Sequence, residues 1–233
     1  MMKYIKITLS QLYISRSFFE KLKHNFHELT ILEKVFYLLF VRPFFLKEKR
    51  FFFEGSLLVP GQMYISDRKA IYDIVIENKP RHCFEIGTYT GGGSTFFLAS
   101  AFYKLGSGKV ITLENDRDAF DRAVAFYKKH LKYLLPYVEF VYGNNFKSFE
   151  LYFKKYQSVD CFFLDGAEDS RQTKEQYLEF VNYLHSGTVL MAHDWNTEKT
   201  IDLKPLISED AKWEKILEIG QPQSVGFIAF RRI

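Results

Sequence analysis

The sequence predicts an α/β fold: a mostly parallel sheet of seven strands, covered by helices on both faces and closed by an antiparallel hairpin. Two observations predict it. Apolar runs typical of buried strands alternate with helical patterns from residue 66 to residue 192, which is the order of a parallel sheet with crossover helices. The last two runs, at 213–219 and 225–231, are separated by five residues and no helix, so they must pair antiparallel.

The elements follow in chain order. Ser66 is expected to cap the first helix of the main domain, which Pro80 stops. Another helix is expected where Tyr177 and Val181 fall on one face. The other expected helices are at residues 94–104, 119–131 and 147–156, and the five parallel strands at 82–86, 109–113, 138–142, 159–164 and 188–192.

Composition predicts one main domain with an appendage. The chain has 233 residues, 47% of them hydrophobic and 26% charged, which is ordinary for a globular protein. A boundary is expected near Pro60, which gives an N-terminal extension over residues 1–62 and a main domain over 63–233. Cys83 and Cys161 each fall inside a predicted buried strand without Cys-x-x-Cys spacing, so both are expected to be free thiols.

Charge is concentrated at the start of the chain. Residues 1–50 hold ten Lys/Arg and four Glu, which gives +6 and leaves −2 of the total +4 for the rest, so nucleic acid is not an expected partner. The basic, aromatic extension is expected to be helical and to cap the active site or form the interface of a homodimer, with contact to a membrane surface as the third alternative. No secretory leader and no apolar run of about 18 residues is visible, which predicts a cytoplasmic protein.

A glycine turn follows the first predicted strand. Glu85 and Gly87 end that strand, three consecutive glycines begin at Gly91, and a helical pattern starts at Ser94. Glycines at such a turn allow close approach of a ligand, and the N-terminus of the next helix favours an anion. Tyr89 stands where the dinucleotide-binding fingerprint needs its second glycine, so a nicotinamide cofactor is disfavoured. A surface turn without a ligand is the alternative.

Polar residues follow every predicted parallel strand, and these strand ends share one edge of the sheet. Glu114 is placed to accept hydrogen bonds from both hydroxyls of a ribose; alternatively it caps the next helix, a task that Asp116 or Asp118 could take instead. Asn145 could pair with the edge of an adenine or belong to an ordinary turn.

Four segments at these strand ends carry a resemblance to a known family. They are EIGTYTG at 85–91, VITLE at 110–114, FLDG at 163–166 and GTVLMAHD at 187–194. In this order they resemble the class I S-adenosylmethionine-dependent methyltransferases, whose sheet is Rossmann-like. Within that class the chain is most similar to small-molecule O-methyltransferases related to catechol O-methyltransferase and to bacterial enzymes with Asp-Gly and His-Asp strand ends. The resemblance covers residues 65–233.

The resemblance implies methylation of a hydroxyl on a small molecule such as a sugar or a natural-product intermediate. It places the methionine part of the cofactor near the glycine turn, its ribose at Glu114 and its adenine at Asn145. The implied cofactor contacts are Glu85, Gly87, Tyr89, Gly91, Ser94, Glu114, Asn145 and Asp165. The implied ligands of a divalent metal, with Mg²⁺ expected, are Asp165, His193 and Asp194.

The sequence departs from the family pattern in three places. The glycine turn is one residue longer, and His193 stands where a carboxylate is usual, so it is a metal ligand, a general base or a hydrogen-bonded strand-end histidine. Glu168 stands where relatives carry a Lys or His that takes the substrate proton, so it either serves as the base or is idle. Trp195 lines the acceptor pocket or belongs to the core. The alternative function is an inactive protein of this fold that interacts with a membrane surface or with another protein through its N-terminal segment.

Overall fold

The structure is a computed structural model that describes residues 30–36, 39–40, 63–143 and 146–233. The chain divides into two compact units, residues 1–58 and 59–233. In the first unit, helix α3 (Ile31–Phe36) begins with a capping box in which Thr30 Oγ1 accepts from the Glu33 amide and Glu33 Oε2 accepts from the Thr30 amide. Most of the predicted extension lies outside the described residues, so the roles expected of it stay predictions.

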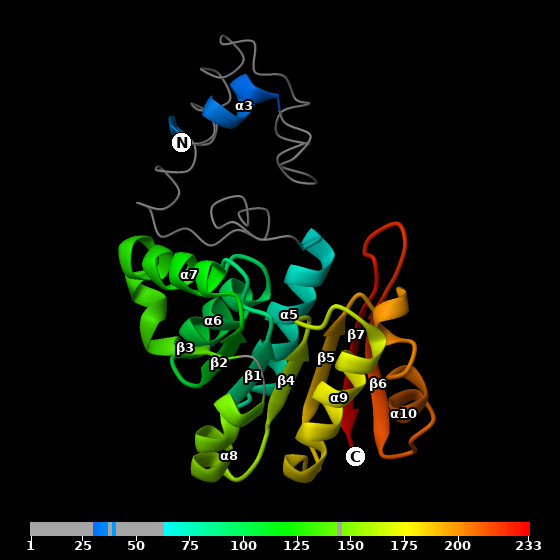
Figure 1. The fold of residues 1–233 in the computed structure, drawn as a ribbon. Coiled ribbons are helices and arrows are strands. Elements are labelled where there is room, and N and C mark those ends of the chain that lie inside the picture. The colour runs from blue at the N-terminus through cyan, green and yellow to red at the C-terminus, as the bar shows by residue number, and fades with distance from the viewer. Residues whose placement is uncertain (1–29, 37–38, 41–62, 144–145) are drawn as a thin grey trace. The chain divides into compact units, whose positions relative to one another are not determined.

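The second unit contains the predicted sheet, with strand order β3-β2-β1-β4-β5-β7-β6 (Figure 1). Strands β1 to β5 pair in parallel, and β7 runs antiparallel between β5 and β6, which confirms the closing hairpin. The strands are β1 (His82–Ile86), β2 (Lys109–Glu114), β3 (Val138–Tyr142), β4 (Cys161–Leu164), β5 (Val189–His193), β6 (Trp213–Ile219) and β7 (Phe227–Arg232).

Helices lie on both faces of this sheet, as predicted. The helices of the second unit are α5 (Ile65–Asn78), α6 (Ser94–Leu105), α7 (Arg117–His130), α8 (Glu150–Tyr156), α9 (Ser170–Phe180) and α10 (Lys204–Ser208), with short 3-10 turns at η4 (Lys132–Tyr137), η5 (Phe146–Phe149), η6 (Val181–Tyr183) and η7 (Glu198–Thr200). None of the helices within the described ranges is both long enough and apolar enough to cross a membrane.

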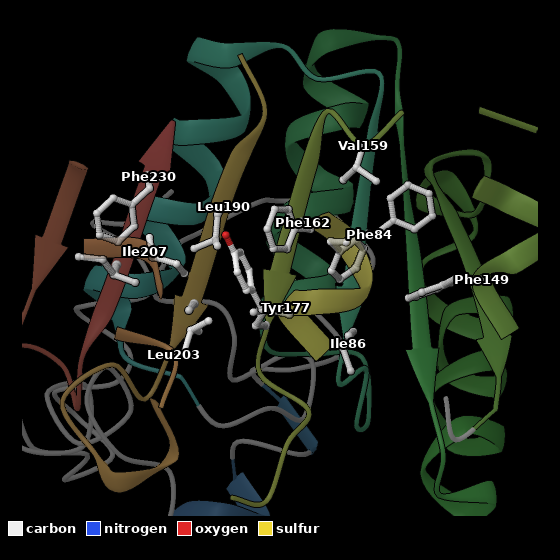
Figure 2. Close-up of a cluster of buried hydrophobic side chains, with 14 of the residues drawn as sticks. Phe84, Ile86, Phe149, Val159, Phe162, Tyr177, Leu190, Leu203, Ile207 and Phe230 are labelled. Carbon is white, nitrogen blue, oxygen red and sulfur yellow. The ribbon is translucent and has the colours of Figure 1, made fainter. Parts of the chain in front are cut away.

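One face of the sheet forms an aromatic core (Figure 2). Phe84, Phe162 and Leu190 from three adjacent strands point into it, and Phe149 and Tyr177 close it from the helical side. Alternate residues of a strand point to opposite faces, so Cys83 and Glu85 lie on the other face. The predicted free thiols, Cys83 and Cys161, are partners in the register of β1 and β4, and their buried sulfur atoms are 3.3 Å apart.

Some local predictions were wrong. Ser66 does not cap α5: the helix begins one residue earlier after Tyr64, and the Ser66 hydroxyl donates to the Gln223 carbonyl at 2.5 Å, so a distant loop uses the group that a local cap would have used. The fourth strand begins at Cys161 rather than at 159, and the helix predicted at 147–156 starts as a 3-10 turn.

The strand order reverses at β1, which in parallel sheets is the usual place of a ligand site. The chain moves from β1 to β2 and β3 on one side and then returns to place β4 and β5 on the other side of β1. At such a reversal the connections leave in opposite directions, which opens a crevice at the carboxyl ends of the two central strands. The predicted functional residues lie at or directly after the carboxyl ends of β1, β2, β4 and β5.

Candidate active site

The glycine turn is held against the end of β2. The amides of Gly87 and Thr88 both donate to the Leu113 carbonyl, at 3.0 and 3.2 Å, and the Gly91 amide donates to the Thr88 carbonyl at 2.9 Å. Gly87 and Gly91 have φ of 101° and 78°, and Tyr89 has a left-handed backbone with φ of 49°. The turn leads into α6, whose N-cap residue is a glycine without a capping side chain, so the first amides of that helix can receive an anion.

Tyr127 of α7 supports this turn from behind. Its hydroxyl donates to the Gly91 carbonyl at 2.8 Å, and its side chain is fully buried. A Cβ on Gly91 would lie 2.9 Å from Tyr127 Cε2, so the ring fills the space that a side chain would need. Burial raises the pKa of Tyr127, which keeps the hydroxyl neutral and able to donate. Sequence reasoning missed Tyr127 because no local pattern links it to a turn 36 residues earlier.

Tyr127→Phe is expected to remove this hydrogen bond and leave the Gly91 carbonyl buried beside an apolar ring. We expect a loss of about 1 kcal/mol in the free energy of unfolding, measured by urea denaturation. Tyr103→Phe, at a half-exposed tyrosine of α6, is the matched control and is expected to leave stability within about 0.5 kcal/mol. Equal stability of wild type and Tyr127→Phe would show that the hydroxyl does not hold the turn.

Glu85 lies beneath the turn and is fully buried. Its Oε2 accepts from Thr95 Oγ1 at 2.6 Å, whereas its Oε1 has no hydrogen-bond partner among the residues that the structure describes. Burial, which disfavours the charged form, raises the pKa of Glu85 to about 7, although the nearby hydroxyls of Ser94, Thr112 and Thr95 oppose this. The orphaned oxygen is a group that a ligand with a donor could satisfy.

Glu114 faces the glycine turn from the end of β2. Its Oε2 accepts from the Tyr89 amide at 2.5 Å, and its Oε1 accepts from the amides of Asn115 and Asp116 at 2.9 Å. Asp116 caps α7 by accepting from the Ala119 amide at 2.7 Å, so Glu114 is not the helix cap. The carboxylate and the turn therefore form one cradle. Asn145, the predicted adenine contact, lies outside the described residues.

A second cluster lies at the ends of β4 and β5. Asp165, His193 and Asp194 each offer a ligand atom, and these atoms lie within 4.8 Å of one another. His193 Nδ1 is 3.3 Å from Asp165 Oδ1 and 3.4 Å from Asp194 Oδ1. Asp194 has a left-handed backbone with φ of 55°, directly after the end of β5. A small cavity with room for about one water molecule opens among these side chains.

The model of a family described as "Methyltransferase domain" matches residues 84–195, the stretch that holds both clusters. This segment of the chain matches a methyltransferase domain. This confirms the resemblance seen in the sequence. A search of the curated proteins finds no sequence match.

Solved structures share the fold of the methyltransferase domain. The O-methyltransferase TomG of Streptomyces achromogenes, involved in tomaymycin synthesis and solved with SAM, is 15% identical, with 76% of this chain and 93% of that chain covered and a TM-score of 0.60. An O-methyltransferase of Bacillus cereus, solved with SAH, is 20% identical, with 99% and 97% covered and a TM-score of 0.59. SAH-bound PaMTH1 of Podospora anserina is 14% identical, with 83% and 88% covered and a TM-score of 0.56. At these identities the likeness shows the fold alone.

In the methyltransferase domain, His193 is surrounded by three carboxylates. Its Nε2 is 3.2 Å from Oδ2 of Asp67, a buried residue of α5. Burial would lower the pKa of His193, but hydrogen bonds to Asp165 and Asp67 and the charge of Asp194 raise it to about 10. A ring that holds a proton on each nitrogen donates hydrogen bonds and cannot accept a proton. Its predicted role as a general base stays a prediction that this geometry does not favour.

Lys199 joins the same cluster from the loop after β5. Its Nζ donates to Asp194 Oδ2 at 2.8 Å, and it lines the small cavity. Burial lowers the pKa of Lys199, but the bond to Asp194 outweighs this and raises it above the ordinary value, so the amine is charged. Sequence reasoning missed Lys199, since a lysine in a loop has no distinctive signal before the loop is folded.

Two other predicted residues lie apart from the cavity. Glu168 is exposed, and it is not among the residues that line the cavity, although its neighbour Ala167 is. Its role as a base stays a prediction. Trp195 belongs to the core: it is 4% exposed and packs against Phe230.

The donors of the second cluster fit a divalent metal. Asp165 and Asp194 supply carboxylate oxygens and His193 supplies a nitrogen, a set of two oxygens and one nitrogen around one point. Gln176 of α9 lines the same cavity, and its Oε1 is buried without a hydrogen-bond partner among the described residues. The carboxylates of Asp67, Asp165 and Asp194 favour a proton on His193. They would also favour a metal cation in place of that proton.

Proposed function

We propose that this chain is an S-adenosylmethionine-dependent O-methyltransferase that acts on a hydroxyl of a small molecule with the help of a divalent metal. One observation supports this most: Glu114, which faces the glycine turn, and the cluster of Asp165, His193 and Asp194 lie at the ends of strands on either side of the crevice where the strand order reverses. A nucleoside cradle and a polar acceptor site on opposite sides of one crevice suit transfer from one ligand to another.

The first cluster would bind the cofactor. The amides at the start of α6 suit the carboxylate of its methionine part, and Glu114 can accept from both ribose hydroxyls with its two oxygens. The Tyr89 amide already donates to Glu114, so the Glu114 carboxylate would accept from this amide and from the ribose hydroxyls together. Glu85 beneath the turn offers its orphaned Oε1 to a donor such as the methionine ammonium.

The second cluster would hold the acceptor. In the reaction an acceptor oxygen bonds to the methyl carbon, the carbon–sulfur bond breaks with its electrons left on sulfur, and the hydroxyl proton passes to a base or to water. Asp165, His193 and Asp194 would hold a divalent metal, which lowers the pKa of a bound hydroxyl. Charged Lys199 would stabilise negative charge on the acceptor oxygen. A sugar or a natural-product intermediate suits such a site, and TomG, with the same fold, is an O-methyltransferase involved in tomaymycin synthesis.

Calorimetric titration with S-adenosylhomocysteine tests the cofactor part of this proposal. Wild type is expected to bind, and Glu114→Ala is expected to weaken binding by about 100-fold because the ribose hydroxyls lose their charged acceptor. Asp121→Asn, which removes an exposed carboxylate of α7, is the control and is expected to bind like wild type. Thermal unfolding of each variant shows whether the loss is one of binding or of folding, since Glu114 also accepts from three backbone amides.

Absence of binding by wild type at millimolar S-adenosylhomocysteine would reject the cofactor assignment. Binding by folded Glu114→Ala that equals wild type would reject the ribose contact alone. Transfer of a labelled methyl group to a panel of sugars and phenols, with and without divalent metal, then tests the hydroxyl acceptor and the metal.

A further inference from the structure

We propose that Asp67 is a positioning residue that holds His193 as a nitrogen ligand, and that the methyltransferase therefore takes a first-row transition-metal dication in preference to Mg²⁺. The proposal rests on the metal site of the proposed function and changes the ion that was expected there. It assigns a role to α5, a helix that lies before the matched segment 84–195.

Asp67 is fixed by two separate parts of the chain. It lies on α5, 126 residues before His193, and its side chain is fully buried. Its Oδ2 is 3.2 Å from His193 Nε2 and accepts from Ser224 Oγ at 2.9 Å. Ser224 Oγ in turn accepts from the Gly226 amide at 2.9 Å, so the loop before β7 anchors the carboxylate. A buried carboxylate with two such partners has one orientation available to it.

This contact decides which nitrogen of His193 faces the cavity. With Nε2 directed at Asp67, Nδ1 is the atom that lies 3.3 Å from Asp165 Oδ1 and 3.4 Å from Asp194 Oδ1. A ring flip would break the bond to Asp67 and leave a buried carboxylate without that hydrogen-bond donor, which is costly. Histidines that bind metals commonly donate their other N–H to a carboxylate, which fixes the tautomer and makes the ligand nitrogen more basic. Asp67 and His193 have this arrangement.

The ligand set indicates the class of metal. Mg²⁺ prefers oxygen ligands, whereas an imidazole nitrogen favours first-row transition ions, for which affinity rises from Mn²⁺ to Cu²⁺. Asp165 and Asp194 supply oxygens that suit both classes, so the nitrogen of His193 makes the difference. Mn²⁺ is the stringent probe, because it binds nitrogen least strongly in the series.

The test measures Mn²⁺ binding to the metal-stripped full chain by electron paramagnetic resonance of the free ion, with Mg²⁺ as competitor. Wild type is expected to bind Mn²⁺ about tenfold or more tightly than Mg²⁺. Asp67→Asn is expected to weaken Mn²⁺ binding about 10- to 100-fold, the usual cost of losing a partner that orients a metal ligand. Glu77→Gln removes an exposed carboxylate from the same helix and is expected to leave Mn²⁺ affinity unchanged. Ser224→Ala, which removes only the anchor of Asp67, is expected to show a smaller loss and serves if Asp67→Asn does not fold.

The variant His193→Asn tests whether Asp67 acts through the metal-binding nitrogen of His193 or only stabilises the fold. It replaces the nitrogen by an amide oxygen, so the ratio of Mn²⁺ to Mg²⁺ affinity is expected to fall toward that of an oxygen-only site. In that background Asp67→Asn is expected to have little further effect on Mn²⁺ affinity. Mn²⁺ affinity of Asp67→Asn within twofold of wild type, or equal affinity of wild type for Mn²⁺ and Mg²⁺, would overturn the inference. Titration of the same samples with S-adenosylhomocysteine distinguishes this failure from failure of the proposed function.

Discussion

Gly87→Ala is expected to lower the free energy of unfolding of the methyltransferase domain by about 2–5 kcal/mol. Gly87 has φ of 101°, a conformation that costs a residue with a Cβ about 1–2 kcal/mol. The added Cβ would also lie 2.9 Å from both the amide nitrogen and the Cα of Gly166, where only backbone could move away. Overpacking against a well-packed interior adds about 1–3 kcal/mol. The sum is a large part of the stability of a typical domain.

Urea denaturation followed by circular dichroism measures this loss. Gly106→Ala is the matched control: Gly106 has φ of 72°, but nothing lies within 4 Å of its added Cβ, so it isolates the backbone cost at about 1 kcal/mol. The difference between the two variants is the cost of crowding Gly166. Equal losses in both variants would mean that β1 and β4 can separate at their ends. That result would contradict the close approach of the Glu-x-Gly and Asp-Gly segments.

Glu85→Gln is expected to become stabilising, relative to wild type, as the pH rises from 5 to 8. The pKa of Glu85 is raised by burial to about 7 in the folded chain, above its value of 4.5 when exposed. A raised carboxyl pKa means that the fold prefers the neutral form, so its contribution to stability is full below pH 4.5 and is lost as the pH rises through 7. The shift corresponds to about 3 kcal/mol of stability lost by wild type over this range. Gln is neutral throughout and does not suffer this loss.

The measurement is the free energy of unfolding of both proteins at several values between pH 5 and pH 8. Burying the Gln amide costs the same at each pH. The prediction therefore concerns how the difference in free energy of unfolding between Glu85→Gln and wild type changes with pH. Glu139→Gln is the control, because the pKa of Glu139 is lowered by its bonds to Tyr152 and Lys109, although its burial opposes this. Glu139 is then ionised across the whole range, and its variant is expected to show a constant difference. A constant difference for Glu85→Gln as well would show that Glu85 ionises freely in the fold.

The sequence predicted the sheet well because the signals for strands are local. The boundaries predicted for β1, β3 and β6 agree with the structure, since each is a short apolar or alternating run between glycine, proline or polar residues. The convergence of Glu114, Asp165, His193 and Asp194 on one edge was also predictable, because parallel strands end together. The closing hairpin followed from a link too short for a crossover.

The partners of these residues could not be predicted in the same way. Asp67, Tyr127 and Ser224 act through contacts between segments that are far apart in the chain, and a single sequence does not encode which helix face will meet which strand end. Lys199 was missed for a related reason: a charged loop residue has many favourable positions until the loop is folded around Asp194. The local rule failed for Ser66 where a tertiary hydrogen bond replaced the helix cap.

The two buried sulfur atoms of Cys83 and Cys161 can be used to detect local opening of the sheet between β1 and β4. Burial raises the pKa of Cys83 well above its ordinary value, and both thiols are fully buried, so a reagent in solution cannot reach either sulfur atom. Alkylation of either thiol must therefore wait until the centre of the sheet separates. The rate of labelling by iodoacetamide, divided by that of the denatured chain, would measure the fraction of molecules that are open. Its decrease on addition of a ligand would show how far the ligand suppresses opening.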